Sequence, residues 1–248
     1  MILEAQNIEK WYFRGKGGSN RFFAVNKTDL KLEPGKITVV TGRSGSGKTT
    51  LMHMMAGLLT PDAGRVKAFL PSVSDAEGRA QEMDLYAMDD DALSRFRNRH
   101  MALVPQGGDV FRDLTVMENI LLPLGIYKSA LRKNVKIPDI EERAGVLLEK
   151  LEIDKLASVP AGELSGGERR RVCVARALCP RPDVIFADEP TSDLDDESMD
   201  MVLRLLRGAA DNGAAVFIVT HDAEALDYAD ISIRMNAGSI EELKKNFV

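Results

Sequence analysis

The sequence has few cysteines, no long hydrophobic run and no excess of positive charge. Its two cysteines, Cys173 and Cys179, fall on different faces of one predicted helix, so they cannot pair within it. Neither has metal-ligand spacing, which favours buried, reduced thiols of the kind found in the cytosol. No segment approaches the ~20 apolar residues of a membrane span, and residues 1–11 lack the apolar core of a signal peptide. The formal net charge of -5 argues against a general nucleic-acid-binding protein.

The hydrophobic pattern predicts an α/β protein with a mainly parallel sheet. The chain has 248 residues, 44% of them hydrophobic, which is enough for one large domain or two lobes sharing a core. Short continuous apolar runs suit strands covered on both faces, and they occur at residues 37–41, 101–104, 184–187 and 216–219. Further strands are predicted at residues 1–12, 22–32 and 65–70. Residues 114–178 have a helical pattern punctuated by prolines, which indicates an inserted helical lobe.

Residues 71–92 are acidic and weakly patterned. We interpret them as a solvated insertion with one helical turn, although a specific acidic binding surface is the alternative.

A glycine-rich octet at residues 42–49 follows the pattern G-x-x-x-x-G-K-[ST]. Glycines let the backbone wrap a phosphate chain closely, a lysine adds charge on the terminal phosphates, and a threonine offers a hydroxyl to Mg²⁺. A buried strand precedes the octet and a helix follows it, which aims a helix N-terminus at phosphate; the alternative is a chance glycine-rich turn. The predicted ATP-binding residues here are Gly42, Arg43, Ser44, Gly45, Ser46, Gly47, Lys48, Thr49 and Thr50.

Polar residues follow three of the apolar runs. Asp188 ends one run and can hold Mg²⁺, while Glu189 beside it can accept a proton from an attacking water. His221 follows the run at 216–219, where it can reach a terminal phosphate and position that water. Gln106 follows the run at 101–104, and its amide oxygen can contact Mg²⁺ or water. Tyr12 offers a ring to stack on adenine, although Trp11, Phe13 and Phe22 compete for that role.

A second anion-binding helix start is predicted at residues 164–168, where Ser165 can cap an arginine-rich helix. The alternatives are an ordinary capped helix and, for Arg169, Arg170 and Arg171, a solvated helical face in preference to a nucleic-acid contact.

Together these motifs resemble the nucleotide-binding subunit of an ATP-binding-cassette (ABC) transporter over nearly the whole chain. The resemblance implies a phosphate-loop ATPase of one domain, with a catalytic core at 1–105 and 181–248, an antiparallel β subdomain, and a helical subdomain at 106–180. It also implies ATP and Mg²⁺ as cofactors, with Thr49, Gln106 and Asp188 around the metal, and Lys48, Glu189 and His221 as catalytic residues. Two subunits, expected to be identical, would close head-to-tail around two ATP molecules. The partner's ATP would then contact Ser165, Gly166, Gly167, Glu168 and Asp195.

Within that family the sequence resembles the branch of lipoprotein-release, macrolide-export and antimicrobial-peptide-resistance ATPases, on residues 95–106, 114–124 and Ala187. The resemblance implies a peripheral protein at the cytoplasmic face of the membrane, whose helical subdomain contacts a permease, with no nucleic acid as partner. A module that signals to a membrane protein or cell-wall hydrolase without transport is the alternative; an ATPase acting on DNA or ribosomes is disfavoured, because there is one uninterrupted cassette. Glu168 and Asp193 depart from the family's usual residues, Gln and a small or amide residue.

Overall fold

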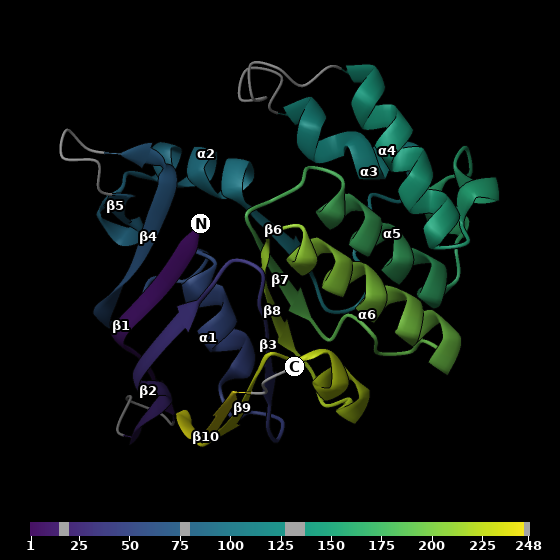
Figure 1. Cartoon of the computed structure of the whole chain (residues 1–248). Coiled ribbons are helices and arrows are strands. Elements are labelled where there is room, and N and C mark those ends of the chain that lie inside the picture. The colour runs from purple at the N-terminus through teal and green to yellow at the C-terminus, as the bar shows by residue number, and fades with distance from the viewer. Residues whose placement is uncertain (15–19, 75–79, 127–136, 246–248) are drawn as a thin grey trace.

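The computed structural model describes residues 1–14, 20–74, 80–126 and 137–245. Figure 1 shows a body of two sheets beside a group of helices.

The larger sheet has six strands, and its inner part is parallel. Neighbouring strands pair in the order β10 (Ser239–Lys245), β9 (Ile231–Asn236), β3 (Ile37–Thr41), β8 (Ala215–Val219), β7 (Val184–Asp188) and β6 (Met101–Val104). Only β10 runs antiparallel to its neighbour. The four apolar runs predicted as strands are therefore confirmed, and β7 and β8 are buried at every residue. The predictions had not included β9 and β10.

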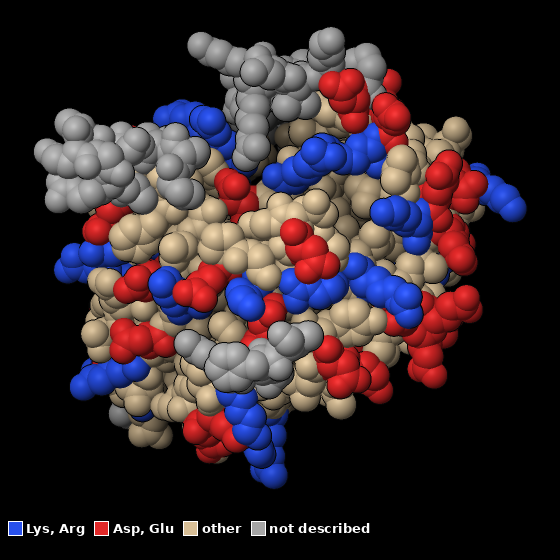
Figure 2. Space-filling model, viewed as in Figure 1, with Lys and Arg blue, Asp and Glu red and all other residues tan. Residues whose placement is uncertain are grey.

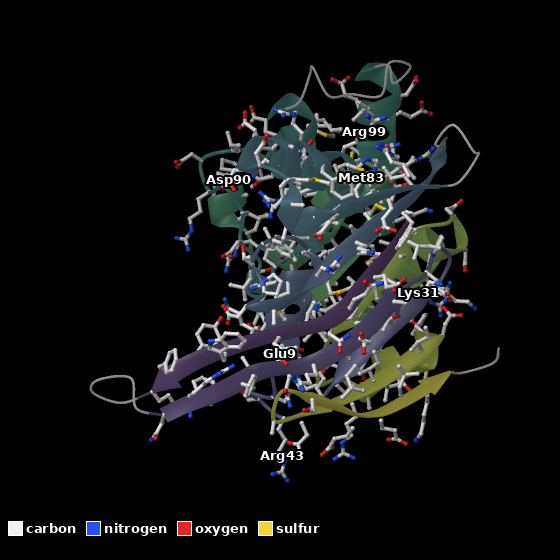
Figure 3. All side chains as sticks on the ribbon, turned by 90° about the vertical axis from the view of Figure 1, so that its left-hand side faces the viewer. Glu9, Lys31, Arg43, Met83, Asp90 and Arg99 are labelled. Atoms are coloured by element: carbon white, nitrogen blue, oxygen red, sulfur yellow. The ribbon has the colours of Figure 1, made fainter. Side chains whose placement is uncertain are left out.

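The smaller sheet is antiparallel, with the order β2 (Asn20–Leu32), β1 (Ile2–Arg14), β4 (Ala63–Ser74) and β5 (Ala80–Asp84). The strands predicted at residues 1–12, 22–32 and 65–70 are confirmed as β1, β2 and β4. Figure 3 shows this sheet, with Glu9 on β1 and Lys31 on β2.

Residues 71–92 were predicted to be a weakly structured, solvated insertion, and the lack of regular structure was wrong for the described part, although residues 75–79 lie outside the described residues. β4 continues to Ser74, β5 pairs back on it, and α2 (Asp90–His100) starts before the segment ends. The predicted helical turn is present as a short 3-10 turn with the fully buried Leu85. Glu82 on β5 is exposed and pairs with Lys67 of β4 at 2.6 Å, so its charge is compatible with a strand that has a solvent side.

The helices cover the larger sheet on both faces. On one face α1 (Lys48–Met55) and the smaller sheet share a core with Phe186 and Phe217, whose rings meet edge-on. On the other face the core contains residues of α6 (Asp196–Asp211) and of three helices that pack on one another: α3 (Val116–Ile126), α4 (Ile137–Lys150) and α5 (Gly166–Leu178). Because alternate residues of β7 and β8 enter opposite cores, the carboxyl ends of these strands are held firmly at one edge.

The two cysteines are buried and free, as predicted, and burial raises the pKa of both thiols. Over the described ranges, none of the helices combines the length and the apolar character needed to cross a bilayer.

Candidate functional site

The phosphate loop, residues 42–49, joins the end of β3 to the start of α1 and fits tightly between two other strands. Gly42 and Gly47 have φ angles of +148° and +102°. A Cβ on Gly47 would lie 1.9 Å from the carbonyl oxygen of Ala24 in β2, and one on Gly42 would lie 2.3 Å from the carbonyl oxygen of Met235 in β9. The loop therefore needs glycine at both positions for backbone conformation and for space.

Lys48 folds back over this loop. Its Nζ donates hydrogen bonds to the carbonyl oxygens of Gly42 at 2.8 Å and Arg43 at 3.2 Å. These neutral acceptors hold the ammonium group at the loop mouth, where a phosphate oxygen would be a stronger acceptor. Arg43 itself is exposed, and Figure 3 shows its side chain extending into solvent. Ser44 and Gly45 are also exposed, whereas Ser46 is buried with its hydroxyl unpartnered; Thr50 is half-buried in α1.

Thr49 and Asp188 meet at the mouth of the loop, although 139 residues separate them. The hydroxyl of Thr49 donates to Oδ2 of Asp188 at 3.0 Å. Burial raises the pKa of the Asp188 carboxyl, an effect that the Thr49 hydrogen bond opposes. A hydroxyl and a carboxylate beside a phosphate loop are the hard oxygen ligands that suit Mg²⁺. Within the described residues no group of three His, Cys, Asp or Glu side chains could hold a metal by itself, so such an ion would also need phosphate or water oxygens.

Glu189 and His221 lie together at the adjoining ends of β7 and β8. His221 Nδ1 lies 2.9 Å from Oε2 of Glu189, and the His221 main-chain N–H donates to the same oxygen at 3.3 Å. The Glu189 hydrogen bond raises the pKa of His221. Asp222 lies on the other side of the imidazole, 3.6 Å from Nε2, and accepts a hydrogen bond from Thr191. The sequence had not indicated this second carboxylate, although Asp222 directly follows His221.

Gln106 and Tyr12 lie on neighbouring elements. Gln106 is exposed two residues beyond β6, whose Val104 pairs with Ala187 of β7, so it lies at the same edge of the sheet as Asp188. Tyr12 is 40% exposed near the end of β1, opposite Phe22 at 5.9 Å between ring centroids.

Trp11 pairs instead with Phe23, and Arg21 stacks over both of those rings, at 4.0 Å from the Trp11 centroid. Trp11 is therefore engaged, whereas Tyr12 and Phe13 are both exposed, at 40% and 61%, and both are accessible to a base.

Ser165 caps α5 as predicted, in a reciprocal capping box. Its hydroxyl accepts from the N–H of Glu168 at 3.3 Å, and Glu168 accepts from the N–H of Ser165 at 2.7 Å. The Ser165 side chain, and after it the Ser165 N–H, lowers the pKa of Glu168. Gly166 and Gly167 form the first turn of that helix. Asp195 similarly caps α6 by accepting from the N–H of Ser198 at 2.8 Å. None of the hydrogen bonds in the described part of the chain joins residues 165–168 to the phosphate loop.

One edge of the sheet holds the phosphate loop, the Thr49 and Asp188 oxygens that suit Mg²⁺, and the Glu189–His221 pair. This combination defines a phosphate-loop ATPase. The chain belongs to the ABC transporter family, whose model, described as "ABC transporter", matches residues 25–192. The resemblance, the α/β fold class and the assignment as an ATPase are confirmed.

Relatives and solved structures agree with this membership. The chain is 32% identical to the lipoprotein-releasing system ATP-binding protein LolD of Buchnera aphidicola, covering 97% of this chain and 96% of the relative. It is 35% identical to the sulfate/thiosulfate import ATP-binding protein CysA of Nitrosomonas europaea, covering 98% of this chain and 60% of the relative.

Two solved structures of the cassette MJ0796 superpose on this chain with a TM-score of 0.83. Each superposition covers 99% of this chain and 100% of the MJ0796 chain. One is described as a dimer and is 28% identical; the other is described as a post-hydrolysis dimer bound to ADP and Pi and is 27% identical.

Proposed function

We propose that this protein is the ATP-binding and ATP-hydrolysing subunit that powers a membrane transporter, most specifically one that handles lipoproteins, peptides or effluxed compounds. The observation that carries the proposal is the arrangement at one sheet edge, where the Thr49–Asp188 and Glu189–His221 pairs lie beside the glycine-rich loop. Repeated similarity to lipoprotein-releasing ATP-binding proteins over almost the full chain supports the narrower assignment.

The residues at the loop supply binding and charge stabilisation. On ATP binding Lys48 exchanges the Gly42 and Arg43 carbonyls for phosphate oxygens, and Tyr12 stacks on adenine. Thr49, Asp188 and Gln106 would hold Mg²⁺, which neutralises charge on the phosphates. The Asp188 carboxylate is already ordered by Thr49, so little rearrangement is needed to present its oxygens.

Glu189 acts as the general base. Its carboxylate accepts a proton from the attacking water, and His221 fixes Oε2 through both its ring and its main-chain N–H. Asp222 lies 3.6 Å from the opposite ring nitrogen, so the imidazole is held between two carboxylates.

A second copy of the chain completes each site. In a head-to-tail pair, the capped helix start would contact ATP held by the other subunit's loop, through Ser165, Gly166, Gly167 and Glu168, with Asp195 linking the two sites. In the described chain Ser165 and Gly166 are exposed, and a Cβ on Gly166 would meet nothing within 4 Å, which suits a ligand arriving from another subunit.

The helical subdomain, residues 106–180, would contact the permease, with the catalytic core at 1–105 and 181–248. Between Gln106 and α3 the segment is shaped by Asn119, which is fully buried and hydrogen-bonds the main chain of Phe111 twice. Phe111 is left 56% exposed, so its ring is accessible as an anchor for a permease helix. The protein would then sit at the cytoplasmic face of the membrane as a peripheral subunit.

Blue and red side chains are interspersed on the face in Figure 2, and the formal net charge of -5 argues against a general nucleic-acid-binding protein.

The proposal is tested with Glu189→Gln, trapped with ATP and Mg²⁺. We expect ATP binding to persist, turnover to fall ~10²–10⁴-fold, and an ATP-bound dimer to accumulate in size-exclusion chromatography with light scattering. Turnover close to wild type would remove Glu189 from the base role.

The same trapped variant, tagged and expressed in its native cell, identifies the membrane partner. Co-purification of a multi-span protein from detergent-solubilised membranes is expected. Recovery of only soluble or nucleic-acid partners would refute the transporter assignment and leave the ATPase intact. Phe111→Asp is the matched variant, because it should lose the membrane partner and keep ATP hydrolysis.

A further inference from the structure

Arg170 of α5 is a buried cation that the mechanism above does not use. Its side chain is only 4% exposed, and a buried charge is costly unless its N–H groups find acceptors. Nη1 donates to the main-chain oxygen of Glu189 at 2.7 Å, and Nη2 lies 3.6 Å from the carboxylate of Asp193. One contact of Arg170 is therefore with the proposed base, Glu189, and the other is with the loop that follows it.

The main chain at Glu189 requires such support. Its φ of +49° lies in the left-handed region, where a residue other than glycine is strained, and Pro190 follows it. The Glu189 N–H donates to the carbonyl of Val219 at 2.8 Å. Its carbonyl accepts from Ser192 as well as Arg170, but among its described donors only Arg170 is charged, and charge-assisted hydrogen bonds are the stronger ones.

Arg170 also lies where several functional segments converge. It is in the same helix as the capping residue Ser165, so both move as one rigid element. The segment after Gln106 packs against it, because a Cβ on Gly108 would lie 3.3 Å from the Arg170 main-chain nitrogen. Asp193, with φ of +61°, ends the turn that precedes Asp195, the cap of α6.

We propose that Arg170 is a positioning residue, which fixes the carboxylate of Glu189 and makes its placement depend on where α5 sits. This inference rests on the proposed function, in which the start of α5 contacts ATP on the second subunit. Binding of that ATP to the start of α5 then fixes the position of α5 and of Arg170 within it. Arg170 in turn fixes the position of the Glu189 main chain through its hydrogen bond to the Glu189 carbonyl oxygen. Asp193, which departs from the family's usual small or amide residue, supplies the counter-charge.

The test replaces Arg170 with Met, which keeps length and removes every donor. We expect kcat for ATP hydrolysis to fall ~10–100-fold, because displacement of a catalytic group by about 1 Å has effects of that size. KM for ATP should not change, since the phosphate loop is untouched. The matched control is Arg176→Met on the same helix: Arg176 also donates to a main-chain oxygen at 2.7 Å, that of Asp109, and its kcat should match wild type.

A double-mutant cycle separates positioning from general destabilisation. In a Glu189→Gln background, single-turnover hydrolysis should be no slower with Arg170→Met than without it, because the two residues act as one unit. A further additive loss, or a wild-type kcat in folded Arg170→Met, would overturn the inference.

Should Arg170→Met fail to fold in a thermal melt, Arg170→Gln takes its place. It keeps an amide donor without the charge and should give an intermediate kcat; a wild-type kcat would overturn the proposal. If wild-type protein hydrolyses no ATP, the proposed function fails. A different outcome refutes only the role of Arg170: wild type hydrolyses ATP, Glu189→Gln does not, and the Arg170 variants have the wild-type kcat.

Discussion

Gly47→Ala should destabilise the protein and abolish tight ATP binding, for reasons the geometry makes quantitative. The added Cβ would lie 1.9 Å from the Ala24 carbonyl oxygen, more than 1 Å inside the 3.0 Å limit that real Cβ atoms respect. The Ala24 carbonyl carbon would also be in tight contact at 3.1 Å, so the loop or the neighbouring strand has to move. The φ of +102° adds strain of about 1–3 kcal/mol.

Together, the backbone strain and the movement of the loop or strand should lower the unfolding free energy of Gly47→Ala by more than ~4 kcal/mol. Gly45→Ala is the matched control, since φ there is +77° but the Cβ would meet nothing within 4 Å. Its loss should stay at about 1–3 kcal/mol, the strain alone. Urea denaturation without nucleotide measures both variants, and an equilibrium binding assay with labelled ATP follows on Gly47→Ala. Equal stability losses in the two variants would refute the packing argument.

Two further predictions concern the pairs at the sheet edge. Thr49→Ala should raise the Mg²⁺ concentration needed for half-maximal ATPase activity, because one of the proposed ligands is lost, while its melting temperature changes little; an unchanged Mg²⁺ titration would remove Thr49 from the metal site. The folded-state pKa of His221 is raised by Glu189, so the pair's contribution to stability is present below the unfolded pKa of about 6.5 and is lost as pH rises through the folded pKa. Wild type should therefore exceed His221→Ala in unfolding free energy by more at pH 6 than at pH 9, and a gap that grows with pH would contradict the pairing.

The sequence predicted the inner sheet and the phosphate loop well because their signals are local. β3, β7 and β8 contain continuous apolar runs and are almost entirely buried, since both of their faces are covered. β9 was missed because it lacks a continuous apolar run, its residues alternating between buried and exposed positions as in Ile233 and Arg234, and β10 was missed because four of its seven residues are charged. α6 was missed even though Asp195 is a strong capping residue.

Contacts between distant segments could not be predicted from local pattern. The Thr49–Asp188 bond and the Glu189–His221 pair depend on the strand order, and only strand order explains why residues so far apart in sequence share one edge. Arg170 illustrates the same limit, because three consecutive arginines in a helix predict a solvated face. The structure instead buries it against the carbonyl of Glu189.

The most direct test of the central claim, that each ATP site is built from two chains, is a subunit-mixing experiment. Lys48→Ala disables the phosphate loop. Gly166→Glu places charge on the exposed start of α5, where a Cβ meets nothing within 4 Å, so folding should be preserved. Each variant alone should be nearly inactive. In a mixed dimer one site combines the intact Lys48 of one chain with the intact Gly166 of the other, so ATPase activity should reappear on mixing. If the mixture stays as inactive as its components, the sites are not shared between chains and the account is contradicted.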